Sequence, residues 1–108
     1  MSDIRTQRLR DELKVLGAQF LELSNNGSSL LTVTDIKLSN DKKHATVFFT
    51  AFPESFEKTA LEFAKRKRND FKQFVRDKSR IPRIPQLDFE IDMGEKNRQR
   101  IDELSNQD

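Results

Sequence analysis

The sequence predicts a single α+β domain with the element order helix, strand, strand, helix, helix, strand. Two patterns lead to this expectation. Apolar residues recur at three- and four-residue spacing in some segments, and they alternate with polar residues in three shorter ones. The chain has 108 residues, enough for one domain and too few for two. Nine Phe and many Leu, Ile and Val supply one core, although 35% of the residues are charged.

The first helix is predicted over about residues 4 to 24. The segment from Asn25 to Ser29 ends it, because Gly27 and the two Asn residues suit the left-handed turn that often follows a helix. The apolar stripe of this helix has spacings of four, three, four and three residues and consists of Leu9, Leu13, Leu16, Phe20 and Leu23.

Two strands joined by a polar turn come next. Leu30 to Ser39 is rich in Thr, Val and Ile, but its alternation changes parity near Thr34-Asp35, which indicates a β-bulge or burial on both faces. His44 to Phe52 is the second strand, and the short connection predicts an antiparallel hairpin. One face of the second strand carries Val47, Phe49 and Ala51, and the other carries Thr46, Phe48 and Thr50.

Two helices are predicted after the hairpin. The first begins near Pro53, with Ser55 as its expected cap, and a kink or short break at Asn69-Asp70 separates it from the next. The second helix ends at about Ser79. The expected buried stripes are Phe56, Ala60, Phe63 and Ala64 in the first helix and Phe71, Phe74 and Val75 in the second.

The last strand is predicted from Gln86 to Asp92, after an extended stretch from Ile81 to Pro85 in which each Pro disfavours a helical predecessor. Residues 95–108 offer few apolar anchors, so we expect a peripheral or frayed C-terminal segment there. This element order is the topology of a type II KH domain. It implies a three-stranded mixed sheet with the helices on one face.

Several classes of function are disfavoured by composition. The chain has no Cys, so it has no disulfide, thiolate nucleophile or Cys-based metal site. No apolar run approaches the roughly 20 residues that span a bilayer, and the N-terminus lacks a signal peptide's apolar stretch. We therefore expect a cytoplasmic monomer that is not an enzyme, with no cofactor, metal, membrane partner or small-molecule substrate.

The positive charge is concentrated in one segment. Residues 65–83 hold nine Lys or Arg and two Asp or Glu, a net charge of +7, whereas residues 1–64 carry −1 and residues 86–108 carry −4. Such clustering points to a polyanionic partner, although a run of charge is also typical of a solvated face. Positions 65, 68, 72 and 76 share one helical face by their spacing. The predicted RNA contacts are Lys65, Arg66, Lys67, Arg68, Asn69, Lys72, Arg76, Lys78, Arg80 and Arg83.

Local sequence resembles the ribosome-binding factor A family along most of the chain. The segment Leu31 to Val47 is similar to the family's first hairpin, in which a Ser-x-Asp turn leads into an Ala-x-Val strand. The segment Ile84 to Asp92 is similar to its closing strand, and Arg100 to Leu104 to its C-terminal ending. The resemblance implies a KH-like protein that binds the small ribosomal subunit and its rRNA, assists late maturation of that rRNA and is often linked to cold adaptation.

The chain departs from the family at two places. Much of the family has an Ala-x-Gly kink between the two central helices, where the alignment places Arg68-Asn69-Asp70 without a Gly. The first loop has Asn25-Asn26-Gly27 instead of the family's acidic-Pro-Arg segment. The first departure bears on the shape of the kink and on how closely RNA approaches the backbone there.

Two other functions fit parts of the sequence. A protein-interaction module would use the open sheet face around Phe48 and the acidic last third of the chain, without direct RNA contact. An enzyme, such as a nuclease, would hold a divalent cation between Asp88, Glu90 and Asp92, which alternate on one strand face.

Overall fold

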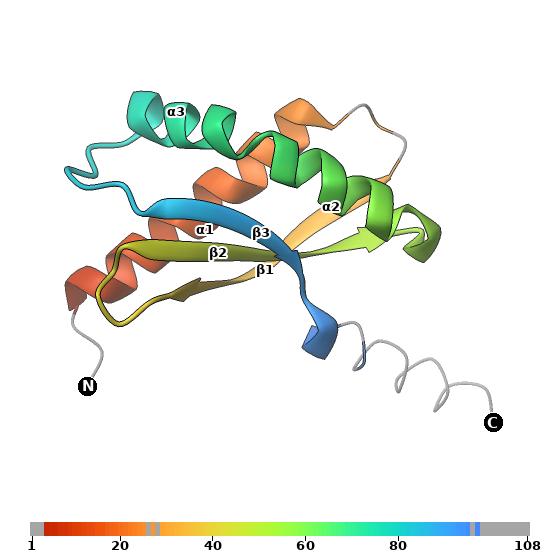
Figure 1. Ribbon diagram of the computed structural model, residues 1–108, viewed down its shortest axis with the longest axis horizontal. Helices are drawn as coiled ribbons and strands as arrows, with labels where there is room; N and C mark the ends of the chain where they lie inside the picture. Colours follow the sequence, from red (N-terminus) through yellow and green to blue (C-terminus); the bar gives the residue numbers. More distant parts are fainter. Residues whose placement is uncertain (1–3, 26, 28, 96, 98–108) are drawn as a thin grey trace.

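The computed structural model describes residues 4–25, 27, 29–95 and 97 of the chain. The order of elements is the one that the sequence predicts, with a short 3-10 turn (η1) added before the second helix. The elements are α1 Ile4–Ser24, β1 Leu30–Leu38, β2 His44–Phe52, η1 Glu54–Phe56, α2 Glu57–Arg66, α3 Arg68–Lys78 and β3 Gln86–Ile91 (Figure 1).

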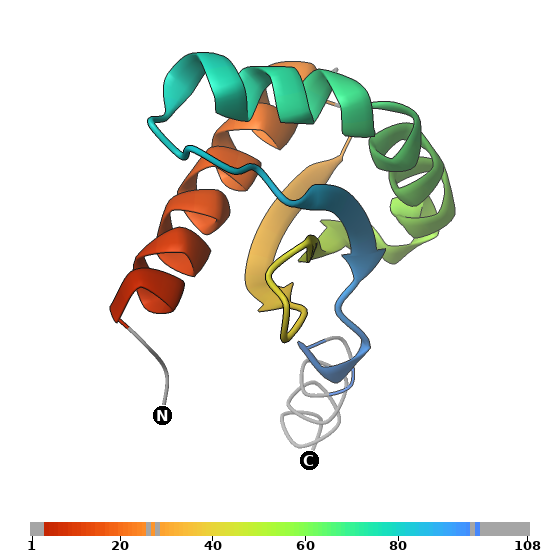
Figure 2. The same ribbon diagram turned by 60° about the vertical axis from the view of Figure 1, so that its left-hand side comes forward.

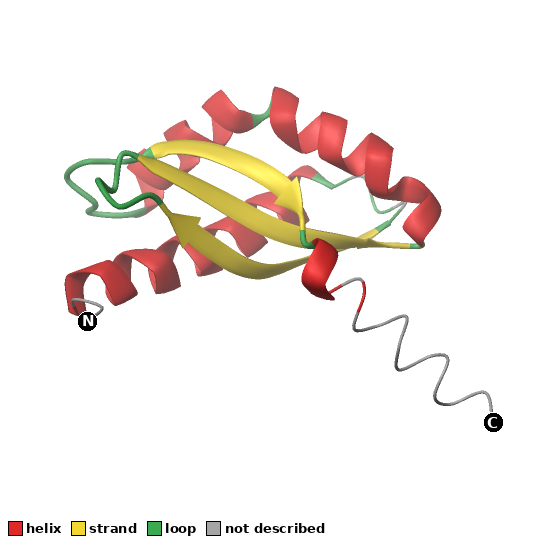
Figure 3. Cartoon of the chain, turned by 60° about the horizontal axis from the view of Figure 1, so that its bottom comes forward, coloured by secondary structure: helices red, strands yellow, loops and turns green. Residues whose placement is uncertain are grey.

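The three strands form one mixed sheet in the order β1-β2-β3. β1 and β2 pair antiparallel, whereas β3 pairs parallel to β2 because the chain crosses over through α2 and α3. The helices lie behind the sheet when it is viewed from its uncovered side (Figure 3), and they wrap around the curved sheet in the turned view (Figure 2). This arrangement confirms the predicted fold class.

The predicted bulge is present in β1. Val33 pairs with Phe49 and Asp35 pairs with Phe48, so Thr34 is the extra residue. If every residue of β1, Thr34 included, paired one-to-one with β2, the period of two that points Val33 inward would point Ile36 away from the core. The bulge therefore explains the change of parity that the sequence shows.

A chain of aromatic rings joins the helical layer to the sheet. The centroid of Phe71 on α3 lies 5.1 Å from that of Phe20 on α1 and 5.2 Å from that of Phe89 on β3. Phe49 on β2 meets Phe89 edge-on at 6.3 Å. A Cβ added to Gly17 would lie 3.3 Å from Val47, so this glycine lets α1 approach the sheet closely.

The buried stripe of α1 differs from the prediction at its C-terminal end. Leu23 is 75% exposed, whereas Leu21 is only 1% exposed. The two residues lie on opposite edges of the stripe that Leu13 and Phe20 define, and the structure buries the edge occupied by Leu21. The other predicted members of this stripe pack in or against the core.

The start of α2 also differs from the prediction. Pro53 and Phe56 occupy the cap positions of η1 and α2, and neither makes a side-chain cap hydrogen bond. The expected cap at Ser55 is therefore wrong, because this residue lies inside the 3-10 turn rather than before a helix. Phe56 lies at the surface, not in the buried stripe.

The two ends of the chain lie largely outside the described residues. Asp92 is the last residue of the sheet region, and its backbone N–H donates to the carbonyl oxygen of Phe49 at 2.8 Å. The prediction for residues 95–108, including the family-like segment Arg100 to Leu104, falls mostly beyond the described part. Of the helices that are described, none is long and apolar enough to cross a membrane.

Candidate nucleic-acid interface

The junction between α2 and α3 is a single residue, Lys67. Its φ of −95° and ψ of 10° interrupt the helix, while its N–H still donates to the carbonyl oxygen of Ala64 and its own carbonyl accepts from Phe71 at 2.8 Å. The predicted break at Asn69-Asp70 is therefore wrong by two residues. Asp70 lies in the first turn of α3, where a carboxylate is favoured by the helix dipole.

This geometry explains why the junction needs no glycine. Lys67 has a negative φ, which any residue adopts without strain. The family's Ala-x-Gly kink was aligned with Arg68-Asn69-Asp70, but these three residues are helical in this chain. The alignment therefore does not locate the junction, which lies at Lys67.

A shallow groove lies between this junction and the start of β3. It brings together five of the ten residues predicted to contact RNA, and β3 adds two more. The lining residues are Lys65, Arg66, Arg68, Asn69, Lys72, Gln86 and Leu87.

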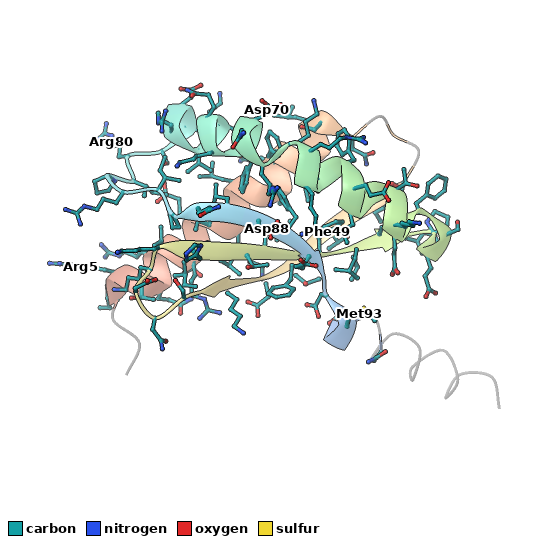
Figure 4. All side chains as sticks on the ribbon, viewed as in Figure 1. Arg5, Phe49, Asp70, Arg80, Asp88 and Met93 are labelled. Atoms are coloured by element: carbon teal, nitrogen blue, oxygen red, sulfur yellow. The ribbon has the colours of Figure 1, made fainter. Side chains whose placement is uncertain are left out.

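Two of the groove's cations are paired with carboxylates of the edge strand. Lys65 Nζ lies 3.2 Å from Asp88 Oδ1 and 2.9 Å from Glu90 Oε1. Arg68 Nη1 lies 3.5 Å from Asp88 Oδ1, and Arg68 Nε donates to the carbonyl oxygen of Lys65 at 3.0 Å. Figure 4 shows Asp88 on β3, below α2 and α3. Lys65 and Arg68 thus tie the helix junction to the sheet edge.

The ion pairs also shift the pKa values of Lys65 and Asp88. The hydrogen bond from Lys65 to Glu90, assisted by Asp88 and opposed by burial, raises the pKa of Lys65 above its ordinary value. Partial burial raises the pKa of Asp88, but the backbone N–H of Phe89 and the ammonium of Lys65 outweigh it and leave that pKa below its usual range. Both shifts favour the charged pair.

The remaining basic residues fall into two groups. Lys67 interacts with residues close to it in the sequence, since its Nζ lies 5.8 Å from the ring centroid of Phe63 and 3.7 Å from Asp70 Oδ2. By contrast, Arg66 and Lys72 form no ion pair with any described residue. Arg76 has Nη1 3.5 Å from the amide oxygen of Gln73.

The predicted face of positions 65, 68, 72 and 76 is therefore split. Its first two cations are paired with carboxylates of β3, whereas Lys72 and Arg76 form no ion pair with any described residue. Lys78, Arg80 and Arg83 do not line the groove. They lie at the far end of α3 and in the loop that follows it.

The apolar side chains on the uncovered sheet face are unequally exposed. Phe48 is half-buried, flanked in the sheet by Asp35 and Glu90. The exposed apolar pair is instead Leu30 and Phe52, which oppose each other and are 65% and 70% exposed. Phe52 has the parity of Phe48 along the strand, so the alternation alone could have identified it.

The acidic strand face gives no support to a metal-dependent enzyme. Asp88 and Glu90 are engaged by Lys65, whereas Asp92 accepts a hydrogen bond from the hydroxyl of Thr34. Within residues 4–25, 27, 29–95 and 97, no three His, Cys, Asp or Glu side chains are placed to hold a metal ion together.

Known proteins with similar sequences and structures identify the family. The family model for ribosome-binding factor A matches residues 5–105. Ribosome-binding factor A of Beutenbergia cavernae is 31% identical over 105 residues, which cover 92% of this chain and 64% of that protein. The chain thus spans just under two thirds of that curated relative's length.

Solved structures give the same result. The crystal structure of ribosome-binding factor A from Thermus thermophilus has a TM-score of 0.70 at 28% identity, covering 79% of this chain and 92% of that one. A Thermus thermophilus homology model fitted into the cryo-EM map of a 30S–RbfA complex has a TM-score of 0.67 at 28% identity, covering 77% of this chain and 90% of that one. The chain belongs to the ribosome-binding factor A family.

Proposed function

We propose that this protein binds the small ribosomal subunit through its rRNA and assists late maturation of that rRNA, acting in the cytoplasm as a monomer and without catalysis. Membership of the family supports binding to the ribosome. A Thermus thermophilus relative that was fitted into a map of a 30S complex supports the small subunit as the partner.

The observation that carries the proposal is the groove beside the α2–α3 junction. Arg66 and Lys72 bring to it positive charge that no described carboxylate neutralises, and Asn69 adds an amide that can donate or accept hydrogen bonds. Cations in such a groove bind RNA phosphates and release the counterions condensed on them, so binding weakens steeply with salt.

Lys65 and Arg68 have a different role in this proposal. Their pairs with Asp88 and Glu90 hold the groove's two walls together, so they shape the site more than they bind phosphate. A groove with fixed walls binds one local RNA arrangement better than others. Assistance to maturation is then a shift of the RNA population toward that arrangement.

The test is co-sedimentation with purified small ribosomal subunits over a salt series. The variant Arg66→Glu with Lys72→Glu reverses two unpaired cations and leaves the ion pairs of β3 intact. The matched control is Arg8→Glu with Lys14→Glu, which reverses one Arg and one Lys on the exposed surface of α1. We expect the natural chain and the control to pellet with subunits at low salt and the groove variant to remain in the supernatant.

Two results would count against the proposal. Equal pelleting of the groove variant and the control would mean that the groove is only a solvated surface. Failure of the natural chain to pellet at any salt concentration would remove the small subunit as the partner.

A protein partner on the uncovered sheet face is a second candidate, favoured by the exposed pair Leu30 and Phe52. It makes the opposite salt prediction, because apolar contacts do not weaken as salt rises. Binding that survives high salt but is lost when Leu30 is changed to Ser would support this candidate.

A further inference from the structure

A second basic surface lies at the end of the sheet where β1 turns into β2. We define it as the basic end surface, formed by Lys42 and Lys43 in that turn and by Arg80 and Arg83 in the loop from α3 to β3. The two segments are joined by a 2.8 Å hydrogen bond from the N–H of Gln86 to the carbonyl oxygen of Lys43. Figures 1 and 3 show the turn and the loop at the same end of the molecule.

The turn is held in one shape by its own hydrogen bonds. Asp41 Oδ1 accepts from the hydroxyl of Ser39 at 2.6 Å and from the N–H of Lys43 at 3.0 Å. Lys42 has a φ of 60°, in the left-handed region, so the chain reverses direction at this residue. Both lysines are exposed, so the turn presents them to solvent from a defined backbone.

The loop is also anchored. Ile81 and Ile84 pack against the core, while Arg80 and Arg83, each preceding one of those Ile residues, remain exposed. The hydroxyl of Ser79 accepts from the N–H of Ile81 at 3.3 Å. Figure 4 shows Arg80 at the same end of the molecule as Arg5 and opposite to Met93.

No described carboxylate pairs with the four cations of this surface. Asp41 is the one carboxylate within the turn Asn40 to Lys43, and the loop from Ser79 to Pro85 has none. Four cations against one anion on two adjoining segments repel one another unless an anionic partner is bound.

We propose that the basic end surface is a second contact for the RNA phosphate backbone, continuous with the groove at the α2–α3 junction; this rests on the proposed function and extends it. Gln86 connects the two sites, because it lines the groove and also bonds to Lys43. An RNA strand that leaves the groove along the start of β3 therefore meets the turn next.

An RNA backbone fits this surface better than an acidic protein does. The four side chains that define the basic end surface are all cationic and exposed. Protein interfaces are centred on buried apolar or aromatic anchors, which such a surface lacks. Phosphate contacts need only charge and hydrogen-bond donors in a fixed position.

The test is binding over a salt series to two probes, purified small subunits and a short single-stranded RNA of about 20 nucleotides, long enough to span several phosphate contacts. The variant is Lys42→Asn with Lys43→Gln, because Asn tolerates the positive φ at position 42 and the fold is then preserved. The control is Lys14→Gln with Lys58→Gln, which removes two exposed cations elsewhere. Circular dichroism and urea unfolding check that both variants fold as the natural chain does.

We expect the turn variant to bind both probes more weakly than the control does, and to reduce the slope of log affinity against log salt by about 1.4 on the single-stranded RNA, for two lost phosphate contacts. A turn variant that matches the control on both probes overturns this proposal, whereas the groove variant can still lose binding and leave the proposed function intact. Loss on the short RNA with no subunit binding by the natural chain would support the RNA contact and overturn the proposed function. Binding by the natural chain to neither probe overturns both.

Discussion

Asp88 has two opposing effects on this molecule. Its carboxylate pairs with Lys65 and Arg68 and so ties α2 and α3 to β3. The same carboxylate cancels positive charge beside the groove that we propose binds RNA. A single substitution can therefore separate stability from affinity at this position.

Asp88→Asn should lower the free energy of unfolding by about 0.5–1 kcal/mol at pH 7, a small value because the side chain is 37% exposed and solvent screens the pair. The pKa of Asp88 is lowered in the folded protein, so its contribution is present above the unfolded pKa of about 3.9 and is lost as pH falls through the folded pKa. Urea unfolding should show a difference at neutral pH that closes once the pH falls below the folded pKa.

The same substitution should raise the affinity for RNA, although it lowers the stability of the fold. Without the carboxylate, Lys65 and Arg68 are freer to reach phosphate, so Asp88→Asn should bind single-stranded RNA more tightly than the natural chain at low salt. Glu62→Gln is the control, since Glu62 is exposed and has no described partner. An Asp88 variant that binds more weakly than this control would show that the paired arrangement is itself the binding form.

The bulge in β1 makes a prediction at the scale of one element. Thr34 is the extra residue between two paired stretches, so deleting it leaves Asp35 facing outward and Ile36 inward in a regular ladder. The deletion removes the hydrogen bonds of the Thr34 hydroxyl to Asp92 and to the carbonyl oxygen of Phe48. Their loss should lower the free energy of unfolding by about 1–2 kcal/mol in total.

Deletion of Lys37 is the comparison, because it also shortens β1 by one residue but lies outside the bulge. It forces Ile36 or Leu38 off the core face, at a cost of about 3 kcal/mol or more. Urea unfolding of the two deletion variants measures the difference. Equal losses would mean that the bulge is needed for the curvature of the sheet and not only for its register.

Helices and strands could be predicted from the sequence where the pattern that marks them lies within the element itself. The period of two located β2 from His44 to Phe52, and the change of parity located the bulge. The α2–α3 junction was misplaced because polar residues such as Asn69 and Asp70 suit both a break and a helix's first turn. Packing against the sheet decides whether such residues form a break or a helical turn. That packing cannot be inferred from a single sequence.

At the scale of the whole molecule, the candidate site could likewise be predicted from the sequence only where its residues are close together along the chain. One groove is lined by cations that are close in sequence, namely Lys65, Arg66, Arg68 and Lys72. The pairing of Lys65 with Asp88 joins residues 23 positions apart and depends on the register of the parallel crossover. The basic end surface likewise joins a turn and a loop that are distant in sequence, so charge counted along the chain did not reveal it.

The chain of aromatic rings couples the helical layer to the sheet, and its central member gives the last prediction. Phe71 contacts Phe20 of α1 and Phe89 of β3 and is fully buried. Phe71→Ala should lower the free energy of unfolding by about 3–5 kcal/mol, a large part of the roughly 5–15 kcal/mol typical of a small domain. Leu23→Ala, at a side chain that is 75% exposed, should change it by less than about 0.5 kcal/mol.

Urea unfolding followed by circular dichroism measures both variants. Because Phe71 bridges α1, α3 and β3, we expect its loss to weaken all three together, in one transition with an unchanged m-value. Three residues that line the groove, Arg68, Asn69 and Lys72, lie on the same helix as Phe71. A second transition in Phe71→Ala, with the sheet still folded, would instead mean that α2 and α3 unfold as a unit and that the proposed RNA site is less stable than the sheet beneath it.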